Sequence, residues 1–132
     1  MPAAARSGLL QIGQVADRTG LSLRTIRFYE EGGLVRPTSR TGGGFRLYSE
    51  ADVSRLEMIK RMKPLGFSLE EMQELLTLLD DLARRPTDAT LVDRLRMFRE
   101  AAGARVAALR DQLAVAEDFA ATLDDHLESG TR

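Results

Sequence analysis

Three things are missing or scarce in this 132-residue sequence: cysteine, long apolar runs and net charge. The absence of cysteine excludes disulfides, thiolate metal sites, iron–sulfur clusters and redox-sensing thiols. No apolar run approaches the ~20 residues of a membrane helix, and residues 1–8 lack the apolar core of a signal peptide. We therefore expect a cytoplasmic protein with no membrane partner, built as one compact domain or as a small domain with an extended element.

The net charge of −1 is an average over two very different halves. Residues 1–66 carry 11 basic and 6 acidic side chains, whereas residues 67–132 carry 8 and 14. The first half is therefore basic and the second acidic. This split indicates that the first half contacts a polyanion and that the second does not.

The first half begins with two short helices. The apolar spacing predicts one helix over residues 12–19 and another over residues 23–31. Gly20 ends the first helix, because glycine enters the left-handed region without strain, and Ser22 caps the second. Two helices joined by a short turn that contains glycine form a helix-turn-helix pair.

The next segment changes character. Pro37 interrupts residues 34–48, Gly42, Gly43 and Gly44 form a flexible tip, and residues 45–48 alternate as a strand does, which together predict a β-hairpin or wing. Ser49 opens a third helix that ends near residues 64–66, and residues 68–71 form a capping box for a fourth.

The second half is dominated by one long helix. After a polar connector at residues 80–89, Thr90 with Asp93 begins a helix that runs to about Leu127. Its apolar residues follow heptad spacing, with one inserted interval of four between Ala102 and Val106. A helix of roughly 35 residues spans ~50 Å, more than so small a domain can cover. We expect its apolar seam to meet a second copy of the chain, although it could also fold back onto its own domain.

Basic and aromatic residues cluster on the second helix and the hairpin, as nucleic-acid contact requires. Arginine can form bidentate bonds to guanine, threonine can contact a thymine methyl group, and either can bind phosphate. Each of these positions could instead belong to an ordinary solvated surface, and cations are also common at helix C-termini. The expected DNA contacts are Arg24, Thr25, Arg27 and Tyr29 on the helix, Arg36, Arg40, Phe45 and Arg46 on the wing, and Lys60 at the end of the third helix.

Several of these segments together resemble the MerR family of bacterial transcription regulators. They are residues 12–16 (IGQVA), 19–22 (TGLS), 24–34 (RTIRFYEEGGL), 44–48 (GFRLY) and 65–71 (LGFSLEE). The resemblance covers residues 10–79 and is specific, because the helix pair, the wing and the capping-box step occur in the family's order. The long helix resembles the family's only in its length and heptad character.

The resemblance implies a mainly α fold: a winged helix-turn-helix DNA-binding domain, then a long dimerisation helix in an antiparallel coiled coil. It implies a homodimer, paired through residues 90–127, on a pseudo-palindromic promoter operator in double-stranded DNA. Distortion of that DNA would activate or repress the promoter and reach RNA polymerase only indirectly. The expected segments are a flexible N-terminus (1–9), the DNA-binding domain (10–79), the connector (80–89), the dimerisation helix (90–127) and a tail (128–132).

Effector sensing is where the sequence departs from the family. Metal- and redox-sensing members use cysteines beside the dimerisation helix, and this sequence has none, so we expect no metal site and no cofactor. The acidic residues around His126 are more typical of a solvated helix end. If an unidentified small-molecule effector binds, its pocket would lie between the fourth helix and the partner's long helix, although the same residues could be simple core. They are Met72, Leu76, Leu79, Phe98 and Phe119.

Other functions remain as alternatives. An architectural or excisionase-like DNA-bending protein could use the same winged helix without sensing any effector. A coiled-coil interaction protein would gain nothing from a glycine-tipped wing. An enzyme is not expected, because the sequence offers no nucleophile–base pair, no metal-ligand spacing and no phosphate-binding glycine motif that leads into a helix.

Overall fold

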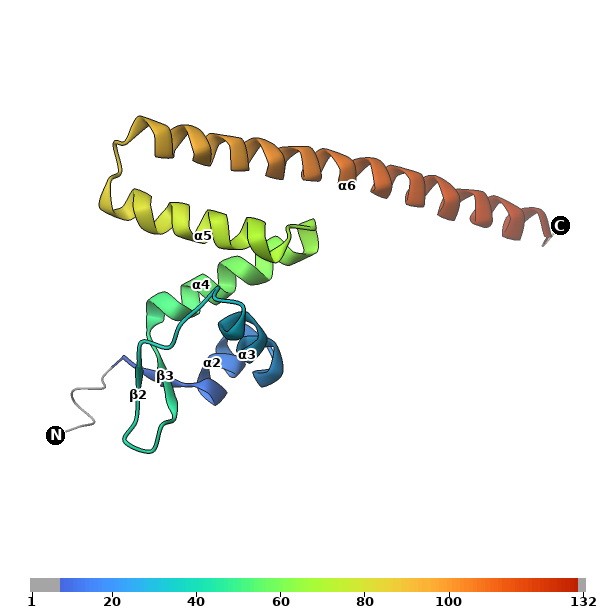
Figure 1. The fold of residues 1–132 in the computed structure, drawn as a ribbon. Coiled ribbons are helices and arrows are strands. Elements are labelled where there is room, and N and C mark those ends of the chain that lie inside the picture. The colour runs from blue at the N-terminus through green and yellow to red at the C-terminus, as the bar shows by residue number, and fades with distance from the viewer. Residues whose placement is uncertain (1–7, 131–132) are drawn as a thin grey trace. The chain divides into compact units, whose positions relative to one another are not determined.

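A computed structural model describes residues 8–130 of the chain (Figure 1). Residues 1–7 and 131–132 lie outside the described residues, and with them most of the expected flexible N-terminus (1–9) and the end of the expected tail (128–132). The chain divides into two compact units, one that ends at Thr87 and one that begins at Asp88. The expected mainly helical fold, with a small sheet and a long C-terminal helix, is confirmed.

The helices of the first unit begin where the sequence predicts. Gly20 has φ 75°, in the left-handed region, and ends α2. Ser22 caps α3, and the capping boxes of Ser49 and Ser68 open α4 and α5. The helical elements are α2 (Ile12–Thr19), α3 (Leu23–Glu31), α4 (Glu50–Met62), the 3-10 turn η1 (Lys63–Leu65) and α5 (Leu69–Arg84).

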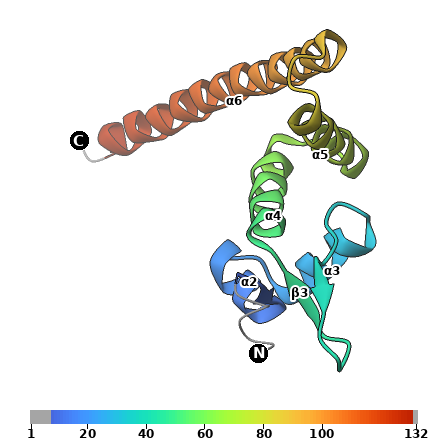
Figure 2. The same cartoon turned by 90° about the vertical axis from the view of Figure 1, so that its left-hand side faces the viewer.

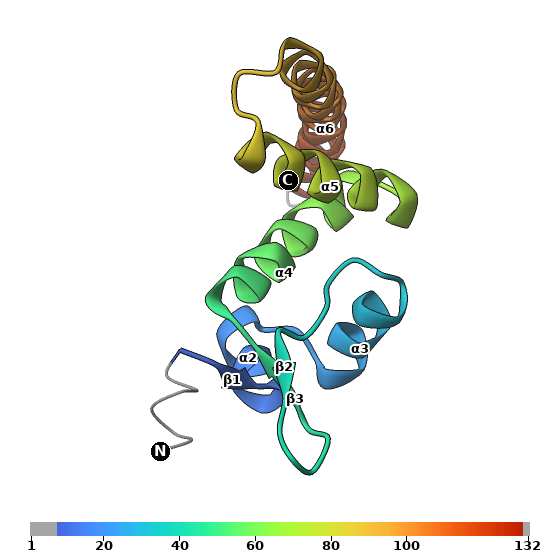
Figure 3. The same cartoon turned by 60° about the vertical axis from the view of Figure 1, so that its left-hand side comes forward.

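A three-stranded antiparallel sheet forms the wing. Its order is β1 (Leu10–Gln11), β3 (Arg46–Tyr48), β2 (Ser39–Arg40). The central strand β3 pairs with β1 through Tyr48 and Leu10, and with β2 through Arg46 and Arg40. The tip of the β2–β3 hairpin points away from α4 and α5 (Figures 1 and 3).

The core of the first unit lies where α2, α3, the sheet and α4 meet. Its largest fully buried side chains are apolar or aromatic and come from every one of these elements, as their helical and strand periodicities predict. They include Val15, Ile26, Tyr29, Tyr48, Leu56 and Ile59. This core fixes α3 and the hairpin on one small body.

Helix α5 is longer than the sequence indicated. It continues past residue 79 to Arg84, so the irregular stretch before the next helix is residues 85–88 and not 80–89. The polar Asp80 and Asp81 suggested a loop, but leucine and alanine at 82 and 83 favour helix, and Asp81 pairs with Arg84 one turn later. Pro86 then cannot continue the helix.

The second unit is a single helix, α6 (Ala89–Gly130). Asp88, and not the predicted pair Thr90 and Asp93, caps it: Asp88 Oδ1 accepts the backbone N–H groups of Thr90 at 3.0 Å and of Leu91 at 3.2 Å. Gly103 lies within the helix without breaking it. The helix extends three residues beyond Leu127, so residues 128–130 are helical.

Candidate nucleic-acid interface

The outer face of α3 carries two arginines and an aromatic ring. Ile26 and Tyr29 face the core, with 0% and 2% of their surfaces exposed. Arg24, Arg27 and Phe28 lie three and four residues apart on the other side of the helix and are exposed. Within residues 8–130 neither arginine has an ion-pair partner. Both guanidinium groups are therefore available to a polyanion.

Thr25 is tied to the N-terminal cap of the same helix. Ser22 Oγ accepts the backbone N–H of Thr25 at 3.0 Å and donates its own proton to Thr25 Oγ1 at 2.9 Å. The Thr25 side chain is consequently half-buried and oriented by the cap. The contact with a base expected of Thr25 stays a prediction.

Tyr29 lies on the buried side of α3, with 2% of its surface exposed. Its ring lies 5.8 Å from that of Phe28, and the Lys63 ammonium stands 6.0 Å from its centroid in a cation–π arrangement. Lys63 follows α4 directly, so this contact joins α3 to the end of α4. The expected DNA contact of Tyr29 stays a prediction.

The wing presents its basic and aromatic side chains on a tight, glycine-dependent turn. Thr41 N donates to Phe45 O at 2.8 Å, and Gly44, at φ 84°, donates to Thr41 O at 2.9 Å. At the tip Phe45 is 72% exposed. Arg40 is exposed beside it and bonds Gly44 O at 3.2 Å, and Arg36 is exposed at the base of the hairpin.

The wing and α3 lie side by side (Figure 2), and one carboxylate connects them. Glu30 Oε1 lies 2.6 Å from Arg46 Nε, and Glu30 Oε2 accepts the Tyr48 hydroxyl at 2.7 Å. Only 12% of the Glu30 side chain is exposed, against 33% for Arg46. We call Glu30, Arg46 and Tyr48 the Glu30 cluster. Arg46, expected to contact the DNA backbone, is thus held by Glu30 through its Nε, and its partly exposed side chain still reaches the surface.

Burial and hydrogen bonding both act on Tyr48. Its complete burial raises the pKa of the phenol well above its usual range, and the hydrogen bond to Glu30 raises the pKa further. On the surface, Arg18 of α2 bonds Glu50 of α4 at 2.5 Å. That bond lowers the pKa of Glu50 and raises the pKa of Arg18.

Lys60 has a structural partner that its sequence position did not indicate. Its ammonium donates to the backbone carbonyl of Thr19 at 2.6 Å and lies 3.6 Å from Glu57. Thr19 is the last residue of α2, so Lys60 caps the carbonyl end of that helix, where a cation is favoured. The expected DNA contact of Lys60 stays a prediction, from a side chain 45% exposed.

Two family descriptions match this chain. Residues 10–79 match the MerR HTH family regulatory protein, and residues 53–126 match the family described as MerR, DNA binding. The chain belongs to the MerR family. The resemblance noted from the sequence is therefore confirmed.

Individual MerR relatives extend the comparison. The HTH-type transcriptional regulator HmrR of Sinorhizobium medicae is 36% identical over 120 residues, which cover 91% of this chain and 75% of the relative. HmrR of Rhizobium leguminosarum bv. viciae is 44% identical over 79 residues, 60% of each chain. The chain thus spans less than two thirds of some relatives that it matches.

A solved structure supports the MerR fold over nearly the whole chain. It is the N-terminus of MtaN, the Bacillus subtilis multidrug transporter activator. The two are 31% identical, with a TM-score of 0.56, and the similarity covers 89% of this chain and 97% of the other.

The residues expected to line an effector pocket in this MerR protein fall into two groups. Met72 and Leu76 are buried in the first unit, with 2% and 3% exposed, and Leu79 is half-buried beside them. Leu76 and Leu79 line a cavity of about 200 Å³ between α4 and α5. Phe98 and Phe119 belong to α6 in the second unit, where Phe119 is 64% exposed. Within the first unit, the structure brings Met72, Leu76 and Leu79 together on α5.

Metal and membrane sites are not found in the described part of the chain. Among residues 8–130 no group of three or more histidine or carboxylate side chains could hold a metal ion. None of the described helices combines the length and apolar character needed to cross a membrane.

Sequence reasoning missed the acidic residues that organise this interface. From the sequence, Glu30 is expected to repel phosphate. The residues next to it in the sequence do not indicate that its carboxylate faces Arg46 and Tyr48. The sequence offers one weak signal for this contact. Arg46 and Tyr48 are two residues apart, which places both side chains on the same face of a strand. The partner of Lys60, 41 residues away, has no sequence signal.

Proposed function

We propose that this protein is a DNA-binding transcription regulator that acts as a homodimer on a pseudo-palindromic promoter operator. One observation carries the proposal: Arg24 and Arg27 are exposed on α3 and have no ion-pair partner among residues 8–130, and the Glu30 cluster ties that helix to a wing tipped by Phe45. A helix with outward arginines suits the major groove, and an arginine-rich hairpin suits the adjacent backbone. Membership of a family of transcriptional regulators supports the same conclusion.

Helix α6 supports the homodimer. From Val106 onward its large apolar side chains are exposed, with 41% at Val106, 58% at Leu113 and 68% at Leu127. A heptad seam of this kind is stable in water only against a facing helix. A second copy supplies an identical seam, and residues 90–127 are the proposed dimerisation helix.

The consequence for transcription follows from DNA distortion. A dimer that seats two recognition helices and two wings bends or untwists the promoter, at a cost of a few kcal/mol that the added phosphate contacts offset. RNA polymerase then responds to the altered DNA, in the bacterial cytoplasm, without a direct contact to this protein. If a small-molecule effector binds, its proposed pocket lies between α5 and the partner's α6.

The test is binding to a duplex that carries the protein's own promoter, measured by fluorescence anisotropy. We expect binding to weaken steeply between low and moderate salt, because phosphate contacts release counterions. Arg24→Ala should cost ~1–3 kcal/mol and alter the preference at one base step. Arg84→Ala, which removes the same charge from α5, is the matched control and should leave that preference unchanged.

Absence of binding to every promoter duplex at low salt would contradict the proposal. A bend in the DNA without any change in transcription by purified polymerase would favour an architectural role.

A further inference from the structure

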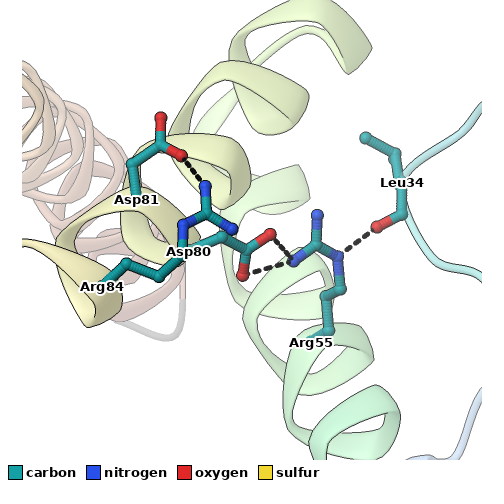
Figure 4. A network of polar contacts seen from close by, with 5 residues as sticks. All are labelled: Leu34, Arg55, Asp80, Asp81 and Arg84. Carbon is teal, nitrogen blue, oxygen red and sulfur yellow. Dashed lines mark hydrogen bonds and ion pairs between the residues drawn. The ribbon is translucent and has the colours of Figure 1, made fainter.

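Arg55 of α4 contacts two distant parts of the first unit (Figure 4). Its Nε donates to the backbone carbonyl of Leu34 at 2.5 Å. Its Nη1 donates to both carboxylate oxygens of Asp80, at 3.1 Å and 2.9 Å. The Arg55 side chain is 23% exposed and the Asp80 side chain 55%, so water reaches the ion pair mainly from the Asp80 side. One guanidinium therefore ties Leu34 to Asp80.

One partner of Arg55 lies just after the recognition helix, and the other lies in the helix that precedes the proposed dimerisation helix. Leu34 lies three residues after the end of the recognition helix, and its backbone N–H donates to Tyr29 O of α3 at 3.0 Å. Asp80 belongs to the last turns of α5, and only residues 85–88 separate α5 from α6. The Arg55 contacts therefore connect the end of the recognition helix with the helix that leads to the proposed dimerisation element.

The Arg55–Asp80 pair adds to the apolar packing of α5. Met72, Leu76 and Leu78 are buried, so apolar burial extends to two residues before Asp80. At the Asp80 end, two cavities flank the pair: one of about 370 Å³, lined also by Gln73 and Thr77, and the apolar one of about 200 Å³. Both cavities are lined by Arg55 and Asp80 themselves. With cavities on both sides, the polar pair is the connection that joins Asp80, beyond Leu78, to α4 and Leu34.

We propose that Arg55 and Asp80 are positioning residues that set the separation of operator half-sites that the dimer accepts. This inference rests on the proposed function. In a dimer joined through α6, the two recognition helices keep a fixed separation and angle only if α5 is stiffly attached to each DNA-binding body. The Arg55–Asp80 pair supplies that stiffness without contact to DNA.

Half-site separation is a sensitive measure of such stiffness. Each inserted base pair moves one half-site by about 3.4 Å and rotates it by roughly 35° about the duplex. A stiff dimer cannot follow that change and loses affinity. A dimer with a loose joint follows the displaced half-site and loses less.

The experiment compares full-length wild type, Asp80→Asn and Asp81→Asn on operator duplexes whose half-site spacing is native or changed by one base pair. Asp81→Asn is a matched control, because it removes the same charge one position away, where the carboxylate pairs with Arg84 of its own helix. We expect one base pair to weaken the wild type and Asp81→Asn at least tenfold, and Asp80→Asn threefold or less. Arg55→Lys keeps the charge but cannot form both contacts, and should behave as Asp80→Asn does.

Each other outcome is decisive. Coincident spacing profiles for wild type and Asp80→Asn, or equal changes in Asp80→Asn and Asp81→Asn, would overturn this inference alone. Equal affinity of the wild type for every half-site spacing would also overturn this inference alone. A wild type that binds no duplex at any spacing would overturn the proposed function as well.

Discussion

Tyr48 shows how a single buried residue can make stability depend on pH. Its phenol is completely buried and donates to Glu30, and both effects raise its pKa above its usual value. The folded protein therefore keeps Tyr48 neutral at pH values where the unfolded chain, with a tyrosine pKa of about 10, releases the proton. The unfolded state then binds fewer protons, so the free energy of unfolding falls as pH rises above about 10.

Tyr48→Phe should reveal this contribution. At pH 8 we expect the variant to be less stable by ~1 kcal/mol, because the hydrogen bond to Glu30 is lost. Above about pH 10 the difference should narrow, since only the wild type loses stability through this phenol. Urea unfolding followed by circular dichroism from pH 8 to 10.5 measures both effects. A difference that stays constant over this range would show that Tyr48 does not titrate as argued.

At the scale of elements, local signals explain why the helices were predictable. Ser22 and Ser68 cap helices through residues three positions away, and Gly20 ends one through its own backbone, so each signal lies within a few residues of its effect. Strand β1 has no such signal, because its two residues are extended only where β3 offers an edge to pair with. The Asp88 cap was missed because Thr90 and Asp93 offered an equally good pattern two residues later.

The polar contacts of the candidate site were not predictable for the same reason. Glu30 and Tyr48 are 18 residues apart, and Arg55 and Asp80 are 25 apart. No periodicity links such pairs, and the tertiary fold alone brings them together. The exposed arginines of α3, by contrast, follow from the periodicity that buries Ile26 and Tyr29.

The Glu30 cluster predicts a change in DNA affinity opposite to the one expected from net charge alone. Glu30→Gln removes a negative charge from a DNA-facing unit, which by charge alone strengthens binding. Because the change also removes the ion pair with Arg46, we expect the wing to lose its fixed position and binding to weaken about fivefold, or ~1 kcal/mol. Anisotropy with several duplexes should show the same loss for every sequence, as it should for Arg46→Ala.

Glu31→Gln is the control for that prediction. Glu31 is the exposed neighbour of Glu30, and its removal changes net charge equally. We expect its affinity for DNA to stay the same or rise. Stronger binding by both variants would mean that Glu30 acts as a charge and not as an anchor for the wing.

For the whole molecule, the decisive question is how α6 meets a second copy. Leu113→Glu places a charge in the middle of the exposed seam, where a dimer would bury it without a partner. A buried unpaired charge costs ~3–5 kcal/mol, so the dimer dissociation constant should rise at least about 100-fold. Gln112→Glu introduces the same charge one position off the seam and should leave the dimer intact. Sedimentation velocity at micromolar concentration separates the two cases, and equal behaviour of the variants would contradict a dimer through this seam.

The tie between α3 and the wing also defines what can be exchanged between relatives of this protein. A chimera that replaces the recognition helix alone would pair a foreign residue at position 30 with the native Arg46 and Tyr48, and the hairpin would lose its anchor. The smallest portable cassette for redesigned DNA specificity is therefore the continuous segment of residues 22–48, which carries the Ser22 cap, the helix, the hairpin and all three members of the cluster.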